Sequence, residues 1–231
     1  FTVALILNLA TSTKKCSVCL ADKGKVISLE EINEGQFTHA EKLHLFIEHV
    51  FLNSGVSMNS VDAVSVSKGP GSYTGLRIGV SAAKGLCFAL DKPLIAIDTL
   101  EILARAVNTE NYAFVVPMID ARRMEVYSAV FDKHYQKIRE TEAEIIHADS
   151  YKTFLAKGRV LFLGDGSGKC KGLLQHEHAV FLPDLLPSAS EMAALSEARF
   201  LEYGFEDVAY FEPYYLKDFI AIKPRDILAK K

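Results

Sequence analysis

The chain has 231 residues, of which 49% are hydrophobic and 24% charged, a composition typical of a globular protein with a substantial core. Its 26 basic and 29 acidic residues leave a net charge of −3, which argues against general coating of a nucleic acid because such proteins are usually strongly basic. Four scattered cysteines are too few for a disulfide scaffold, and no apolar run is long enough to span a bilayer. We therefore expect a soluble, cytoplasmic protein.

The first half of the chain changes from a strand pattern to alternating helices and strands. Short apolar runs separated by turn residues predict strands, and apolar side chains that recur every three or four residues predict helices. The predicted elements are strands at 3–9, 16–21 and 25–31, a helix at 40–51, a strand at 61–66, a helix at 73–90, a strand at 94–97 and a helix at 99–107.

The second half repeats this order in a shortened form. It comprises predicted strands at 112–119, 125–131 and 138–146, a short helix at 150–157, a strand at 160–163, a glycine loop at 164–168, a strand at 179–182 and a helix at 190–202. The polar residues 108–111 separate the two halves. The pattern predicts an α/β fold of two linked lobes, residues 1–108 and 109–231, each with a mixed sheet and helices.

The helix at 73–90 is apolar on nearly its whole circumference. One face suits packing on a sheet, and the opposite side is built of small or apolar residues: Gly75, Ile78, Gly79, Ala82, Gly85, Leu86 and Ala89. On the preceding helix, Leu45 and Leu52 also lie opposite the core stripe. A helix with two apolar sides must be buried on both. Either the same chain covers the second side or another protein does, and we favour a protein interface.

A glycine loop precedes this helix, with Gly69, Pro70 and Gly71 at its centre. Ser72 or Thr74 is expected to cap the helix, and Arg77 follows in its first turns. Such a loop either holds a phosphate or makes a tight strand-to-helix connection. The second interpretation is favoured because neither a G-x-G-x-x-G pattern nor a P-loop lysine is present.

Two further patterns suggest ligand sites and fail on spacing. Residues 164–169 resemble a P-loop but lack one residue between the glycines, so we interpret them as a turn. His39, His44 and His49 are five residues apart and do not share a helix face, whereas metal-binding pairs on a helix are three or four apart. We expect no metal site there.

One carboxylate remains as a candidate. Asp120 ends the strand that opens the second half, and Arg122 and Glu125 follow it closely. These side chains either line a cleft between the lobes or form a structural ion pair.

Several blocks of the chain resemble the TsaB (YeaZ) family. They are residues 6–13 (ILNLATST), 16–18 (CSV), 69–80 (GPGSYTGLRIGV), 83–86 (AKGL), 120–127 (DARRMEVY) and 213–217 (PYYLK). The resemblance implies the actin-like ATPase fold with two RNase-H-like lobes. It also implies a role in making N6-threonylcarbamoyladenosine at position 37 of tRNA. In that system a TsaB protein is a non-catalytic relative of the transferase TsaD. It pairs with TsaD through the first-lobe helices, meets TsaE and tRNA through the complex, and self-associates through the same surface.

Three departures from the family pattern bear on chemistry. Ala10 stands where the first strand usually ends in an acidic residue, Leu43 stands four residues after His39 where TsaD-like proteins have a second histidine, and Lys217 replaces a terminal arginine. The first two favour a scaffold without cofactor, catalytic residues or metal. The alternative is an ATP-dependent small-molecule kinase or ATPase of the same fold, which Ala10 makes less credible.

Overall fold

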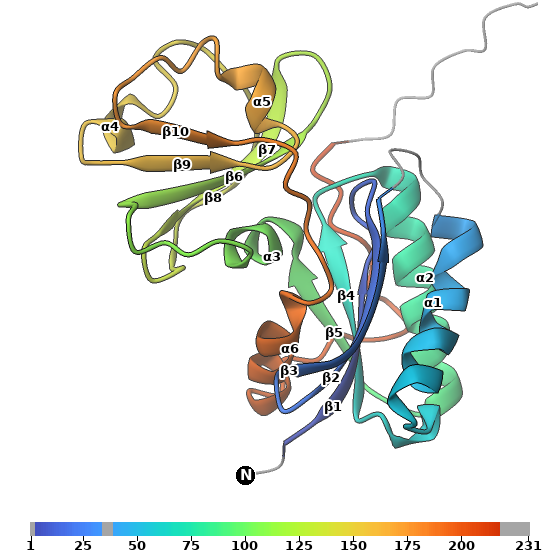
Figure 1. Cartoon of the computed structure of the whole chain (residues 1–231). Helices are drawn as coiled ribbons and strands as arrows, with labels where there is room; N and C mark the ends of the chain where they lie inside the picture. The colour runs from blue at the N-terminus through green and yellow to red at the C-terminus, as the bar shows by residue number, and fades with distance from the viewer. Residues whose placement is uncertain (1–2, 34–38, 218–231) are drawn as a thin grey trace, which may run out of the picture.

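The computed structural model describes residues 3–33 and 39–217, arranged in two lobes (Figure 1). The first lobe contains β1 (Leu5–Ala10), β2 (Cys16–Asp22), β3 (Lys25–Ile32), α1 (His39–Ser54), β4 (Ala63–Gly69), α2 (Tyr73–Leu90), β5 (Leu94–Asp98) and α3 (Thr99–Arg105). This is the predicted order of strands and helices, with one short 3₁₀ helix at Met58–Ser60 in addition. The described helices include none with both the length and the apolar character needed to cross a membrane.

The first lobe is a mixed sheet in the order β3-β2-β1-β4-β5. β1 runs antiparallel to β2 and parallel to β4. α1 and α2 lie side by side on one face of this sheet (Figure 1). Their inward side chains, among them Leu43, Val50 and Val80, join the buried residues of β1, β2 and β4 in one core cluster. This burial is the main source of helix stability, because an amphipathic helix is stabilised chiefly by packing its apolar face.

The second lobe contains β6 (Phe114–Asp120), β7 (Glu125–Asp132), β8 (Lys137–Ile145), α4 (Lys152–Leu155), β9 (Val160–Leu163), α5 (Ser167–Cys170) and β10 (Ala179–Leu182). Its sheet order, β10-β9-β6-β7-β8, repeats that of the first lobe strand for strand. Two sheets with this shared order are the duplicated RNase-H-like lobes of the actin-like fold, so the predicted fold class is confirmed. The glycine loop at 164–168 is a turn only in part, since Ser167 already begins α5.

The last helix crosses back to the first lobe. α6 (Met192–Leu201) was expected with the second half, but it packs on β1, β2 and β5. Met192, Ala193 and Leu195 share a core cluster with the residues of the first sheet that face away from α1 and α2. The division at residue 108 therefore does not describe the packing of α6.

After α6 the chain continues along the first lobe as residues 205–217, here called the C-terminal segment. The backbone N–H of Glu206 donates to the Leu94 carbonyl (2.9 Å), and that of Tyr214 donates to the Lys68 carbonyl (2.7 Å). Between them, the Lys84 ammonium of α2 donates to the carbonyl of Phe211 (2.9 Å). This segment covers one flank of α2 and brings Lys217, the last residue that the structure describes, to Glu125 of the second lobe.

Candidate functional site

The outer face of α1 and α2 carries large apolar side chains in solvent. Leu52 is 75% exposed and Phe88 86% exposed, and Leu45 is also exposed. Gly85 and Ala89 lie on the same side of α2 and are exposed as well. We call these five residues the outer helix face. Within the described residues nothing lies within 4 Å of a Cβ built on Gly85, so a neighbouring backbone has room to approach.

The other predicted interface residues are placed differently. Ile78, Ala82 and Leu86 are only partly exposed and pack against the core cluster of the first lobe. Gly75 and Gly79 are buried. Phe88 was absent from the predicted interface, although its position between Gly85 and Ala89 is the signal that would have found it.

Gly75 and Gly79 face the connection between β1 and β2. A Cβ on Gly75 would lie 2.1 Å from the Thr11 carbonyl oxygen, and one on Gly79 would lie 2.1 Å from the Thr11 Oγ1. The Thr11 hydroxyl donates to the Gly75 carbonyl (2.8 Å). These two glycines are thus required by close packing within the chain, and we correct the expectation that they contact a partner.

The glycine loop packs on the same connection and on the C-terminal segment. A Cβ built on Gly71 would lie 2.2 Å from the Ser12 carbonyl oxygen. Gly69 has φ of +117°, and a Cβ built on it would lie 2.6 Å from the Tyr214 carbonyl oxygen. The Gly69–Pro70 peptide bond is cis. The loop is therefore a tight strand-to-helix connection, and its glycines leave room for the backbone of Ser12 and Tyr214 to pack closely against it.

The remaining residues of this loop shape the start of α2. Ser72 is the N-cap, and its hydroxyl accepts from the Gly75 N–H (3.3 Å). Thr74 is exposed. The Arg77 guanidinium lies 5.2 Å from the centre of the Tyr73 ring. The cap is one of the two predicted residues, and it explains why α2 begins at Tyr73.

The three candidate cleft residues lie in the second lobe, in a network of ion pairs that reaches the C-terminal segment. Asp120 pairs with Lys169, and Glu125 pairs with Lys217 at the end of the C-terminal segment. The Lys169 ammonium also donates to the Glu125 carbonyl (2.6 Å). Arg122 touches this network through its backbone N–H, which donates to Asp120 Oδ1 (2.9 Å). These residues were expected either to line a cleft or to form a structural ion pair, and the ion pairs are observed.

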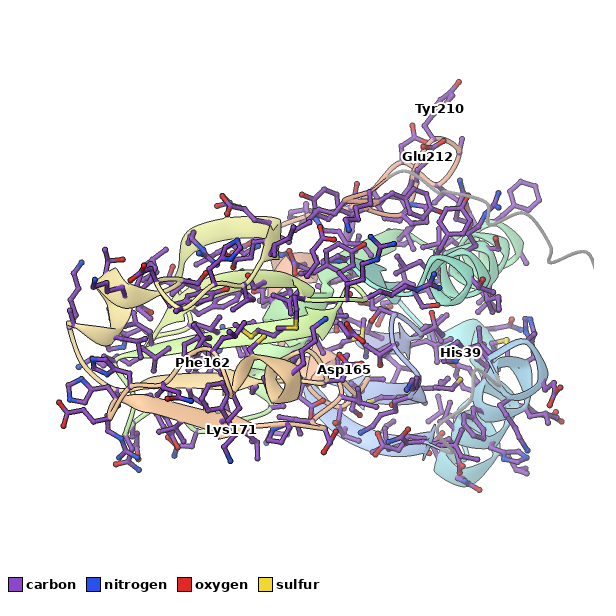
Figure 2. All side chains as sticks on the ribbon, turned by 90° about the horizontal axis from the view of Figure 1, so that it is seen from above. His39, Phe162, Asp165, Lys171, Tyr210 and Glu212 are labelled. Atoms are coloured by element: carbon purple, nitrogen blue, oxygen red, sulfur yellow. The ribbon has the colours of Figure 1, made fainter. Side chains whose placement is uncertain are left out.

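Asp165 lies where the second lobe meets the first (Figure 2). Burial raises its pKa, while the Asp120 N–H, which donates to Asp165 Oδ1 (2.9 Å), acts in the opposite direction. Lys14, in the connection between β1 and β2, also stabilises the Asp165 carboxylate. Charges of both lobes therefore interact at this end of the sheets.

A cavity of about 640 Å³ lies between the lobes. Lys68, Asp98, Lys137, Thr141 and Tyr214 are among its lining residues. Asp98 Oδ2 accepts from the Lys137 ammonium (3.0 Å) and from the Thr141 hydroxyl (3.3 Å). Asp98 also caps α3, so this carboxylate ties β8 of the second lobe to the first.

The histidines and cysteines have structural environments. His39 is buried, and its Nε2 lies 2.7 Å from the Thr13 carbonyl oxygen. Burial lowers the pKa of His39, although the Thr13 contact acts in the opposite direction, and the neutral ring donates its Nε2–H to that carbonyl. Burial also raises the thiol pKa of Cys16 to about 11 and that of Cys19 to about 12. Residues 3–33 and 39–217 contain no group of three or more His, Cys, Asp or Glu placed to hold a metal ion.

The comparisons with known proteins agree with this architecture. Residues 33–223 match the family model described as TsaD, tRNA N6-adenosine threonylcarbamoyltransferase. The chain is 32% identical over 235 residues to the tRNA threonylcarbamoyladenosine biosynthesis protein TsaB of Escherichia coli, covering 94% of this chain and 96% of the relative. The TsaB of Haemophilus influenzae is 29% identical over 231 residues, with 94% and 95% covered.

A solved structure extends the agreement to three dimensions. YeaZ from Pseudomonas aeruginosa matches with a TM-score of 0.81 at 27% identity, covering 92% of this chain and 100% of that one. The two sheets of matching strand order define a protein of the actin-like fold class. Within that class, the chain belongs to the TsaB family.

Proposed function

We propose that this chain takes part in the biosynthesis of N6-threonylcarbamoyladenosine in tRNA as the non-catalytic partner of the transferase TsaD. In this proposal it pairs with TsaD and so supports threonylcarbamoyl transfer to adenosine 37. The names of its relatives and the matching TsaD family model support involvement in this modification. The observation that carries the pairing is the outer helix face, where Leu52 and Phe88 stand in solvent on adjacent helices.

The energetics favour a covered face. Full burial of one such side chain contributes about 1.5–3 kcal/mol, and soluble monomers rarely leave a contiguous apolar patch without a use. Exposed Gly85 weakens α2 by roughly 1 kcal/mol relative to alanine, and a Cβ built there would meet no other part of the described chain within 4 Å. A partner helix packed closely over Gly85 gives this residue a role.

Two observations support a non-catalytic role. Ala10 ends β1 and is buried, so the position offers no carboxylate to a metal-bound phosphate. The connection between β1 and β2 is also closely packed, with Thr11 and Ser12 against the glycines at the start of α2. His39 is packed beneath the same connection through its bond to Thr13.

Other associations follow from the same proposal. TsaE and tRNA meet this chain through the complex with TsaD. A second copy of the chain competes for the outer helix face, so the homodimer and the complex with TsaD are mutually exclusive.

The proposal is tested by mixing the chain with TsaD from the same organism on a sizing column. We expect a complex with wild-type chain and none with Leu52→Arg or Gly85→Arg. Ala82 is a less suitable position, because Ala82 packs against the core and Ala82→Arg would also disturb folding. Ile145→Arg is the matched control, since Ile145 is an exposed apolar residue on β8 of the other lobe. A Gly85→Arg complex as stable as wild type would contradict the proposal.

The kinase alternative has its own test. Calorimetry of the isolated chain with ATP and magnesium is expected to show no turnover. Micromolar binding with turnover would support a small-molecule kinase instead.

A further inference from the structure

The C-terminal segment lies along α2 as a third element beside the two helices of the outer helix face. Val208 and Phe211 of this segment pack against the core cluster of the first lobe that also holds Cys87 of α2. The Lys84 ammonium of α2 donates to the carbonyls of Ala209 (3.2 Å) and Phe211 (2.9 Å). The segment is thus fixed to α2 by apolar packing and by hydrogen bonds from a charged donor, which are stronger than those between neutral groups.

A closely held turn in this segment leaves Tyr210 in solvent. Asp207 Oδ1 accepts from the N–H groups of Ala209 (2.8 Å) and Tyr210 (3.2 Å). The Asp207 carbonyl accepts from the Phe211 N–H (2.8 Å), and the bonds from Lys84 hold the same turn from the side of α2. Tyr210 is 84% exposed, and Figure 2 shows its side chain pointing away from the body of the first lobe. A rigid aromatic side chain presented by an ordered turn loses little conformational freedom when it is bound.

Lys84 joins this turn to the outer helix face. On α2, Phe88 stands four residues after Lys84 on the same side of the helix, and Gly85 follows Lys84 directly. Phe88 and Gly85 belong to the outer helix face, while the Lys84 ammonium contacts the peptide units on both sides of Tyr210. The exposed apolar surface therefore runs from α1 across α2 to the C-terminal segment. Leu52, Phe88 and Tyr210 are among the most exposed large apolar or aromatic side chains that the structure describes.

We propose that the surface covered by TsaD extends beyond the outer helix face to the C-terminal segment, where Tyr210 is a principal contact residue. This inference rests on the proposed function and deepens it, because it adds a contact outside the two helices. The argument for TsaD as the occupant is continuity, since a partner packed over Gly85 and Phe88 lies within the length of the Lys84 side chain from the turn that presents Tyr210. Tyrosine suits such a place because its ring contributes apolar contact area and its hydroxyl forms hydrogen bonds at the edge of an interface.

The test is titration calorimetry of TsaD from the same organism with purified variants of the full chain. Tyr210→Ala should lower the affinity at least about tenfold, as expected for an aromatic anchor, with an unchanged melting temperature because Tyr210 is in solvent. Tyr210→Phe keeps the ring and should bind much more tightly than Tyr210→Ala. Tyr203→Ala is the matched control. Tyr203 is 81% exposed but follows α6, which packs on the opposite face of the first sheet, so this variant should bind like wild type.

Lys84→Met tests how Tyr210 is held in place. Methionine keeps an unbranched chain on α2 but donates no hydrogen bond to the carbonyls of Ala209 and Phe211. We expect it to weaken TsaD binding by roughly threefold or more, and to have little further effect in a chain that already carries Tyr210→Ala. A merely structural role of Lys84 would lower the affinity equally in both backgrounds.

Equal affinity of Tyr210→Ala and wild type, or an equal loss in Tyr203→Ala, would overturn the inference. So would weaker self-association of Tyr210→Ala in sedimentation with unchanged affinity for TsaD, because the segment would then serve a second copy of the chain. Leu52→Arg is measured alongside. If Leu52→Arg abolishes the complex and Tyr210→Ala binds like wild type, the contact ends at the helices and the proposed function stands. If both variants bind like wild type, or wild-type chain forms no complex, the proposed function fails as well.

Discussion

The two halves of α2 use the same residue type for opposite purposes. In the first half, Gly75 and Gly79 are buried, and a Cβ built on either would lie 2.1 Å from an oxygen atom of Thr11. In the second half, Gly85 has nothing within 4 Å of its Cβ position within the described chain, and Phe88 beside it is largely exposed. Close packing within the chain explains the glycines of the first half. It does not explain the glycine and the exposed phenylalanine of the second half.

This difference shows why a stripe of small residues is ambiguous in a sequence. Small residues allow a backbone to approach, but the pattern does not say whether that backbone belongs to the same chain. Here the connection between β1 and β2 occupies the first half of the stripe, and the second half remains available to a partner.

The largest effect on stability is expected from adding a side chain in the first, buried half of α2, here called the inner half; the second half, which carries Gly85 and Phe88, is called the outer half. In Gly75→Ala the new methyl group collides with the Thr11 carbonyl, which is backbone and cannot rotate away. We expect a loss of about 3 kcal/mol in the free energy of unfolding, the upper part of the range for overpacked cores. Urea unfolding of the purified variant checks this, and a change below about 0.5 kcal/mol would remove the distinction between the two halves.

The next effect concerns binding by the outer half. Phe88→Ala removes the most exposed large apolar side chain of the outer helix face. At an interface such a truncation costs about 2 kcal/mol, or roughly thirty-fold in affinity, while the stability of the isolated chain should hardly change because Phe88 is in solvent. Titration calorimetry with TsaD measures the affinity. Unchanged affinity would place the contact elsewhere.

Gly85→Ala should change the stability of the chain in the opposite direction to Gly75→Ala, and so distinguish the two halves of α2. Alanine suits a helix interior better than glycine by about 0.5–1 kcal/mol, and the Cβ meets no neighbour in the described chain. We therefore expect a melting temperature about 1–4 °C higher, opposite in sign to Gly75→Ala. A lower melting temperature would mean that Gly85 is packed as tightly as the inner glycines.

The smallest effect is a pH dependence of the inner half. His39 packs beside Gly75, and burial lowers its pKa in the folded state. The unfolded chain then binds the proton more readily, so stability is complete above the ordinary histidine pKa of about 6.5 and declines as pH falls below it. We expect only a small loss of stability over this pH range, because a single histidine is involved. Thermal unfolding at pH 8 and pH 5.5 should show a smaller difference in His39→Gln than in wild type.

Most of the fold could be predicted from the sequence because its signals are local. Apolar periodicity located the strands and helices of both sheets, and Ser72, the observed cap of α2, was one of the two candidates identified from residue type and position. The crossing of α6 to the first lobe could not be predicted, because the helix is amphipathic wherever it packs and sequence order alone placed it with the second half.

The site was only partly predictable for a similar reason. Leu52 and Gly85 were identified from helix periodicity, yet Gly75 and Gly79 were misassigned because their neighbour, Thr11, is more than sixty residues away in sequence. Likewise, the pairing of Glu125 with Lys217 depends on how the C-terminal segment returns to the cleft. Contacts between distant segments carry no local pattern.

The central claim is that TsaD covers the outer helix face, and selective labelling tests it most directly. All four native cysteines are buried, and burial raises the pKa of Cys87 to about 11, so a maleimide should modify only an introduced thiol. With Leu52→Cys we predict rapid labelling of the free chain and strong protection when TsaD is added, while Ile145→Cys on β8 labels equally in both. Equal labelling of Leu52→Cys with and without TsaD, in a mixture shown to contain the complex, would contradict the account.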